Sequence, residues 1–342
     1  MRCGIITVYD SLNCGSYLQA YALRKAVADL GKESCVIQRA SWDVARSYIK
    51  KVKKYIYCAL KRDRINNKVY KNFECGYPML SLAPCRAKVP VYIMGSDTIW
   101  DVSTPFFGSR WKFFWGAQFK NAKLISYAPS VGFSKQADIE RCSFIRAALQ
   151  NMSAVSVRDQ NSKDLLQPYC DKEISIVCDP TYLLDRSEYD AIAKPTKLEK
   201  FLFIYYYGKM PADYQKAIQD YCKANALKTV TFGPANPWCD ISLAYDPLLF
   251  LSIYQKADYI VTNTFHGTVF ATIYEKRFAV TKNDKPKVLD VLKMCALSDK
   301  MTDTAEDIST ILNSAFNYDV TRQNILRERE KGLEYLKKAI EG

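Results

Sequence analysis

Four stretches of the sequence place polar or charged side chains where an apolar strand is expected to end and a helix to begin. In open α/β folds such junctions collect ligands, because free backbone N–H groups and the helix dipole favour an anion. His266 is the only histidine among 342 residues, and it lies at one of these junctions, in "TNTFHGTVFA". An imidazole there can exchange a proton near neutral pH or contact an anion. The alternative is a packed histidine whose ring nitrogens satisfy a loop carbonyl.

A second junction carries Arg158, in the stretch "AVSVRDQNSKDLL". Arg158 follows an apolar strand directly, and Asp159 is expected to cap the next helix. A guanidinium group binds a carboxylate or phosphate through two parallel hydrogen bonds, so an arginine at a strand end suits an anionic ligand. The alternative is a structural ion pair with a neighbouring acid. If Arg158 and His266 belong to facing domains, together they would hold a small dianion in the cleft.

The third junction is "YIMGSDTIWD", in which Ser96 and Asp97 follow an apolar strand. A carboxylate at the end of a strand can act as the general base for a hydroxyl nucleophile. Asp97 is our candidate for that role. Alternatively, Asp97 caps a short helix over residues 98–100.

The fourth junction is "DSLNCGSYLQAYAL", in which Asn13 and Gly15 form a turn between the first strand and the first helix. Ser16 is the predicted cap of that helix. A turn containing glycine can admit an acceptor or an anion. The G-x-G-x-x-G pattern is absent, so no dinucleotide site is predicted.

Strands and helices alternate along almost the whole sequence, which predicts parallel sheets with helices on both faces. We expect an α/β protein of two Rossmann-like, doubly wound domains that face each other across a cleft. One helix is expected over residues 139–150. The expected units are an N-terminal domain (1–185), a polar, proline-containing linker (186–200), a C-terminal domain (201–318) and a charged helix that bridges back to the first domain (319–342).

The composition is that of a globular protein, with 49% hydrophobic and 25% charged residues. No apolar run approaches the length of a membrane span, and the sequence opens as a strand, "MRCGIITVYD", and not as a signal peptide. The twelve cysteines contain no C-x-x-C pair. This pattern argues against a zinc site and indicates reduced thiols in the cytoplasm, so no metal and no cofactor are expected.

Most of the formal charge of +13 comes from residues 44–73, where ten Lys and Arg residues stand against one acid. Apolar residues lie between these charges at roughly helical spacing. A basic amphipathic helix of this kind can lie on an anionic membrane surface. The alternative is a solvated helix pair that covers one edge of a domain. No recognised nucleic-acid motif accompanies the segment, so no nucleic-acid partner is predicted.

Six stretches, taken in order, resemble the polysaccharide pyruvyl transferase family. They are "NCGSYLQAYAL", "GSDTIW", "SYAPSVG", "SVRD", "DPTYLL" and "YIVTNTFHGTVFA". The resemblance runs from about residue 4 to residue 280. It implies two Rossmann-like domains in the GT-B arrangement. It also implies transfer of the enolpyruvyl carbons of phosphoenolpyruvate, the donor substrate, to hydroxyls of a sugar, which gives a pyruvate ketal on a cell-surface glycan.

The resemblance also assigns residues to the donor site, which it places on the C-terminal domain. Arg158 matches the arginine of "SVRD" and His266 matches the family histidine, so both are expected to bind the donor, with His266 as its acid or phosphate partner. Thr264, Phe265 and Gly267 flank the histidine and are expected to line the same site. Characterised members often carry an arginine at the position of Thr264, so one donor-binding charge differs here.

The acceptor is expected to be a sugar or a lipid-linked oligosaccharide, bound on the N-terminal domain near Asn13, Gly15 and Ser96. The expected function is a pyruvyl transferase of bacterial exopolysaccharide or capsule synthesis, located in the cytoplasm and peripherally at the inner face of the membrane. Two alternatives stay open. One is a GT-B glycosyltransferase with a nucleotide-sugar donor, and the other is a non-catalytic glycan-binding protein.

Overall fold

A computed structural model describes residues 1–9, 13–38, 85–233, 236–281 and 286–342. The basic segment 44–73 lies outside the described residues, so its expected membrane role stays a prediction. Within the described ranges, no helix combines the length and the apolar character that a membrane span requires.

The N-terminal half is built on parallel strands whose residues are mostly buried on both faces. The first sheet has the order β2-β1-β3-β4, and a two-stranded ladder of β5 and β6 lies beyond β4. These strands are β1 (Arg2–Ile6), β2 (Glu33–Val36), β3 (Val91–Met94), β4 (Lys123–Ser126), β5 (Ser156–Val157) and β6 (Ser175–Ile176). The helices are α1 (Cys14–Asp29), α4 (Pro105–Gly108), α5 (Trp111–Phe114), α6 (Gln136–Glu140), α7 (Phe144–Gln150) and α8 (Gln160–Leu166). Continuous apolar strands of this kind are typical of parallel sheets covered by helices on both faces.

The C-terminal half contains a second parallel sheet, of order β12-β11-β10-β7-β8-β9. Its strands are β7 (Phe201–Tyr205), β8 (Lys228–Phe232), β9 (Ile241–Leu243), β10 (Tyr259–Thr262), β11 (Arg277–Thr281) and β12 (Met301–Thr302). Its helices are α10 (Ala212–Ala224), α11 (Pro247–Lys256), α12 (Phe265–Ile273), α13 (Pro286–Met294) and α14 (Asp307–Asn313). This strand order is that of a Rossmann fold.

In each sheet the strand order reverses once, and the two reversals decide where a ligand can bind. The first lies between β1 and β3, and the second lies between β7 and β10. Loops that leave the carboxyl ends of adjacent strands at such a point diverge to opposite faces of the sheet and open a crevice. All four junctions nearest to these crevices carry polar side chains: those after β1, β3, β7 and β10.

Helix α1 joins the two halves. It packs on β2 of its own half and also contacts α11 and α12 of the other half. One continuous cluster of buried apolar side chains therefore includes Ile5 and Val91 from the first sheet as well as Phe203 and Ile260 from the second. The two sheets thus share part of their hydrophobic core, beside the polar crevice at their carboxyl ends.

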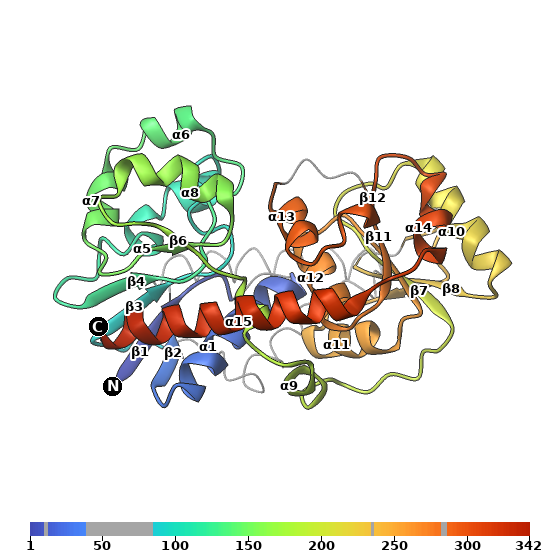
Figure 1. Cartoon of the computed structure of the whole chain (residues 1–342), viewed down its shortest axis with the longest axis horizontal. Helices are drawn as coiled ribbons and strands as arrows, with labels where there is room; N and C mark the ends of the chain where they lie inside the picture. Colours follow the sequence, from blue (N-terminus) through green and yellow to red (C-terminus); the bar gives the residue numbers. More distant parts are fainter. Residues whose placement is uncertain (10–12, 39–84, 234–235, 282–285) are drawn as a thin grey trace, which may run out of the picture.

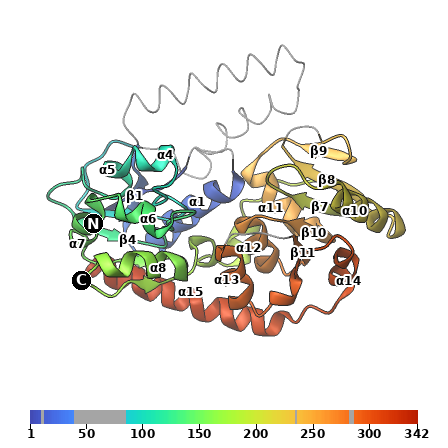
Figure 2. The same ribbon diagram turned by 90° about the horizontal axis from the view of Figure 1, so that it is seen from above.

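The C-terminal helix α15 spans Tyr318–Glu341 and lies along both halves of the molecule (Figure 1, Figure 2). Near its start, Thr321 Oγ1 donates a hydrogen bond to the carbonyl oxygen of Cys295, at 2.7 Å, in the C-terminal half. Near its end, Tyr335 Oη donates to the carbonyl oxygen of Ser126, at 3.0 Å, in the N-terminal half.

Two local expectations need correction, and the structure also describes the expected linker. The helix expected over residues 139–150 is two helices, α6 and α7, which are separated at residues 141–143. Ser16 does not cap α1, because the side chain of Asn13 caps it by accepting from the backbone N–H groups of Gly15 and Ser16. The segment 186–200 begins with a short helix, α9 (Arg186–Asp190), and has no further helix or strand.

Candidate functional site

A cavity of about 280 Å³ lies where the crevices of the two sheets meet. Every one of the four junctions at the strand reversals contributes to its wall, as does the loop segment around α4. The lining residues are Val8, Asn13, Ser16, Asp97, Thr98, Phe107, Tyr205, Tyr207, Thr264, Phe265, His266 and Lys287. We call this the junction cavity. Its size is close to that of sites that bind small ligands.

His266 is the second residue of α12, and its ring lies between the two halves. Thr264 caps this helix, because its Oγ1 accepts a hydrogen bond from the N–H of Gly267 at 2.9 Å. The imidazole packs on Gly15 of α1 so closely that a Cβ on that glycine would lie 2.2 Å from His266 Cγ. Gly15 is therefore the residue that lets the first turn of α1 approach α12.

Asp97 lies opposite, at the end of β3. Its backbone has a φ of 74°, which few residues other than glycine adopt. Its carboxylate accepts hydrogen bonds from Ser16 Oγ at 2.5 Å and from the N–H of Thr98 at 2.8 Å. Residues 98–100 form no helix, so the capping role considered for Asp97 is wrong.

The pKa of Asp97 reflects a competition between burial and neighbouring charge. Burial alone would raise this pKa, but the positive charges of Arg158, His266 and Lys287 and the hydrogen bond from Ser16 outweigh it and lower the pKa to about 2. The carboxylate is therefore ionised at neutral pH.

Arg158 and His266 are linked through a third side chain, Asp179, which precedes the short 3₁₀ turn Pro180–Tyr182. Arg158 Nη1 donates to Asp179 Oδ2 at 2.8 Å, and both side chains are buried. His266 Nε2 lies 3.8 Å from the same oxygen, which is too far for a hydrogen bond. The ion pair considered for Arg158 is thus present, yet its Nε and Nη2 and the Nε2 of His266 are buried without a hydrogen-bond partner among the described residues.

Two opposite influences act on the imidazole. Burial lowers the pKa of His266, and Arg158 and Lys287 lower it further, while Asp179 and Asp97 raise it. The net result is a pKa below the ordinary value of about 6.5. The 3.8 Å approach to Asp179 is therefore a contact of a neutral imidazole at pH 7, and not a salt bridge.

A second, larger cavity of about 400 Å³ adjoins the first, and Arg158 lines this one. Phe265 and Lys287 line both cavities. The guanidinium carbon of Arg158 lies 4.2 Å from the centroid of the Phe265 ring, and Lys287 Nζ lies 5.7 Å from it. The His266 ring also lies beside Phe265, with 5.1 Å between the ring centroids, so Phe265 contacts both candidate donor-binding side chains.

Ser96 and Gly267, both expected to line the site, have structural contacts instead. Ser96 is fully buried, and its Oγ lies within hydrogen-bonding distance of the Ala128 carbonyl oxygen (3.0 Å) and of Asp179 Oδ2 (3.3 Å). Neither residue lines either cavity, and the N–H of Gly267 is already bonded to Thr264. Asn13 does line the junction cavity, and its Oδ1 also accepts a hydrogen bond from Tyr205 Oη across the two halves, at 3.2 Å.

The sequence pattern had not singled out Asp179 or Lys287 for the site. The stretch "DPTYLL" contains Asp179, but the role of a buried aspartate before a proline cannot be predicted until its contacts are known. In the part of the chain that the structure describes, no group of three or more His, Cys, Asp or Glu side chains is placed to hold a metal ion.

A comparison with known protein families assigns the chain to one of them. A family model described as polysaccharide pyruvyl transferase matches residues 13–285. The chain belongs to this family. The match covers the junctions that line the cavity after β3, β7 and β10, together with Asn13 and Ser16 of the junction after β1. The family name describes transferases that act on polysaccharide. No curated protein sequence matches the chain.

Solved structures show that this pyruvyl transferase family member has a GT-B fold. A UDP-N-acetylglucosamine 2-epimerase is similar with a TM-score of 0.56 and 13% identity, over 98% of this chain and 94% of the other. The putative enzyme of that name from Listeria monocytogenes has a TM-score of 0.54 and 10% identity, over 94% and 90%. The Neisseria meningitidis enzyme, bound to UDP-GlcNAc, has a TM-score of 0.50 and 10% identity, over 99% and 100%. At these identities the likeness concerns the fold alone.

Proposed function

We propose that this protein transfers the pyruvyl group of phosphoenolpyruvate to two hydroxyls of a sugar. The observation that carries the proposal is the pairing, in one cavity, of a buried neutral imidazole with an ionised carboxylate. His266 and Asp97 line the same cavity from opposite halves of the molecule. His266 can supply the proton that the donor needs, and Asp97 can take a proton from a sugar hydroxyl.

The reaction requires both groups. Protonation of the methylene carbon of phosphoenolpyruvate makes its methyl group and leaves the adjacent carbon cationic. Two sugar hydroxyls attack this carbon in turn, the bond to phosphate oxygen breaks, and a pyruvate ketal and hydrogen phosphate result. Of the two hydroxyl protons, one replaces the proton taken up by the methylene carbon and the other leaves with phosphate.

The donor anion is proposed to bind where the two cavities meet. There it can take the unpartnered N–H groups of Arg158, the charge of Lys287 and His266 Nε2. A trianionic ligand opposes the burial that lowers the pKa of His266, so the imidazole is expected to take up a proton as the donor binds.

The same binding step would activate Asp97. The charges of Arg158 and Lys287, and that of His266 when it is protonated, hold the pKa of its carboxyl at about 2, where it is a weak base. Pairing of Arg158 and Lys287 with the donor removes part of that effect, so the pKa of Asp97 rises only in the donor complex. The base would thus become effective once the donor is in place.

The direct test is phosphate release from phosphoenolpyruvate in the presence of sugars and lipid-linked oligosaccharides, our proposed acceptors at the cytoplasmic face of the membrane. Release is expected to depend on the acceptor and to fall at least 100-fold in His266→Gln, which keeps a hydrogen-bonding group but delivers no proton. Absence of acceptor-dependent release across a broad panel contradicts the proposal, as does tight binding of UDP without binding of phosphoenolpyruvate.

Calorimetry gives a second readout that needs no acceptor. Titration of phosphoenolpyruvate in two buffers of different ionisation enthalpy is expected to show proton uptake at pH 7.5 in the wild type. His266→Gln is expected to bind without this uptake. Equal uptake in the variant would show that the proton does not reside on His266.

A further inference from the structure

Three consecutive tyrosines, 205–207, stand at the end of β7 and directly after it, and the proposed reaction uses none of them. Tyr205 is buried, and its hydroxyl is bonded to Asn13. Tyr206 packs against the apolar cluster on the other face of the sheet. Tyr207 differs from both, because 46% of it is exposed although it lines the junction cavity.

Tyr207 is held firmly by its backbone. Its N–H donates to Asn263 Oδ1 at 2.8 Å, and its carbonyl oxygen accepts from Asn263 Nδ2 at 2.9 Å. Its ring also lies edge-on to that of Tyr205, with 6.4 Å between the centroids. A large aromatic ring is thus held in place at the wall of a polar cavity while much of its surface faces solvent.

The N-terminal half contributes another ring and polar groups to the same cavity. Phe107 of α4 lines the cavity from the N-terminal half and is kept in position by an edge-on contact with Phe114, at 5.3 Å between centroids. Asp97 and Asn13 line the same cavity. The cavity therefore offers aromatic surfaces together with oxygen acceptors for hydrogen-bond donors.

We propose that Tyr207 is the stacking surface for the acceptor, and that the acceptor group bound there is a single uncharged pyranose ring. The C–H face of a pyranose is apolar and packs on an aromatic ring, while its hydroxyls lie at the edge and donate to oxygen acceptors. A ring stacked on Tyr207 directs hydroxyls toward Asp97. This inference rests on the proposed function, and it names the chemical class of its acceptor.

An uncharged sugar fits this part of the cavity better than a nucleotide. An aromatic ring can stack with a nucleobase as well, but Lys287 and His266 are taken by the donor in the proposed function, and the described lining of the cavity holds no further cation. The phosphates of a nucleotide would then lie near an ionised carboxylate, Asp97. Like charges in a partly buried site repel strongly. A pyranose has no such charge, and each of its hydroxyls can donate to a carboxylate or amide oxygen.

Saturation-transfer NMR with the full chain tests the inference. The probes are the methyl glycosides of galactose, glucose, mannose and N-acetylglucosamine, with UDP as the nucleotide probe. We expect transfer to the ring protons of at least one glycoside in the wild type. Tyr207→Phe is expected to bind it as the wild type does, and Tyr207→Ala is expected to bind it about five- to tenfold more weakly.

The matched control is Phe133→Ala, which removes another exposed ring that lines neither cavity. It is expected to leave glycoside binding unchanged. Wild-type binding in Tyr207→Ala overturns the inference, as does the absence of transfer to every glycoside. Transfer to the base protons of UDP alone, lost in Tyr207→Ala, would make Tyr207 a nucleobase platform and overturn it too.

Phosphoenolpyruvate affinity, measured on the same variants, separates this inference from the proposed function. Tyr207→Ala is expected to bind phosphoenolpyruvate as the wild type does, because Tyr207 does not line the cavity that holds Arg158. If the glycosides bind through Tyr207 and phosphoenolpyruvate does not bind at all, the stacking surface stands and the donor assignment fails.

Discussion

Gly15 shows how one missing side chain permits the contact between the two halves. Because the His266 ring lies against its Cα, an added methyl group would have to displace either the ring or the first turn of α1. Gly15→Ala is expected to destabilise the protein by about 1–3 kcal/mol, as overpacking does in tightly packed interiors. It is also expected to reduce turnover, because both groups line or adjoin the junction cavity. Urea denaturation and phosphate release are the measurements.

A double variant tests whether the effect of Gly15→Ala passes through the imidazole. In Gly15→Ala/His266→Gly the added methyl group has room, because the ring and the Cβ of His266, which would lie 2.3 Å away, are both absent. The two changes should therefore not be additive, and Gly15→Ala should cost little stability in the His266→Gly background. Additive losses of stability would show that the methyl group added at position 15 clashes with another part of the protein and not with the imidazole. Turnover should stay low in the double variant in either case.

The single histidine makes a pH prediction possible at the residue scale. Burial and nearby cations keep the pKa of His266 below 6.5 in the folded protein. Below about pH 6.5 the unfolded chain therefore binds a proton that the folded chain does not. The stabilising effect of the neutral ring is fully present above that pH and is lost as the pH falls toward the folded-state pKa.

Urea denaturation at pH 7.5 and pH 5.5 measures this effect. The free energy of unfolding of the wild type should fall relative to that of His266→Gln, with a slope that approaches about 1.4 kcal/mol per pH unit. All other titrating groups are shared by the two proteins, so their contributions cancel in the difference. Parallel pH profiles for the wild type and His266→Gln would rule out a lowered pKa.

At the scale of elements, the cap of α12 explains why a threonine is used at position 264. Thr264 Oγ1 accepts from the N–H of Gly267, and it also lies 3.0 Å from Thr262 Oγ1. An arginine there would lose this cap. Thr264→Arg is expected to cost about 0.5–2 kcal/mol of stability, while Thr264→Ser keeps the cap and most of the stability. Urea midpoints of the two variants and the wild type decide this, and equal stability of the arginine variant would contradict it.

The elements themselves were largely predictable because apolar periodicity and turn residues are local signals. The strand-to-helix junction expected at His266 is present, between β10 and α12. The edge strands β9 and β12 have three and two residues, too few to show a pattern. The break between α6 and α7 also went unpredicted, because residues 139–150 keep an apolar spacing compatible with one helix.

The candidate site was predictable only in part, for a different reason. His266, Arg158 and Asp97 could be proposed because each follows a strand, and strand ends form one edge of a parallel sheet. Asp179 and Lys287 could not, because their importance arises from contacts with residues far away in the sequence. The position of Asn13 as the cap of α1 was missed since Ser16, three residues later, has an equally suitable side chain.

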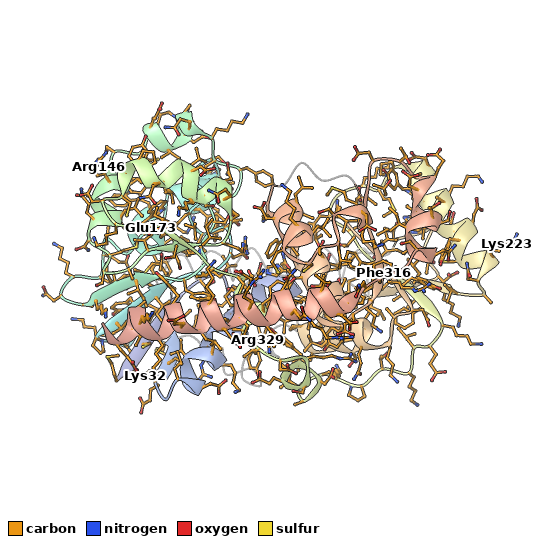
Figure 3. All side chains as sticks on the ribbon, viewed as in Figure 1. Lys32, Arg146, Glu173, Lys223, Phe316 and Arg329 are labelled. Atoms are coloured by element: carbon orange, nitrogen blue, oxygen red, sulfur yellow. The ribbon has the colours of Figure 1, made fainter. Side chains whose placement is uncertain are left out.

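At the scale of the whole molecule, α15 contacts both halves, and Arg329, in the middle part of this helix, makes several of these contacts (Figure 3). Arg329 Nε donates to the carbonyl oxygen of Tyr182 and its Nη2 donates to that of Leu184, both at 2.8 Å. Its Nη1 also lies 3.2 Å from the carboxylate of Asp185. These three acceptors belong to the segment that follows Asp179, so the attachment of α15 and the buried ion pair of the site share one stretch of chain.

Loss of this attachment should therefore affect both stability and the site. Arg329→Ala is expected to lower the free energy of unfolding by about 2–3 kcal/mol, because two carbonyl oxygens lose a charged donor. It is also expected to weaken phosphoenolpyruvate binding, since Asp179 orients Arg158 through the 2.8 Å contact. The matched control is Lys337→Ala, on the exposed side of the same helix, which should change neither quantity. If Arg329→Ala loses stability but binds phosphoenolpyruvate as the wild type does, α15 supports the fold without supporting the site.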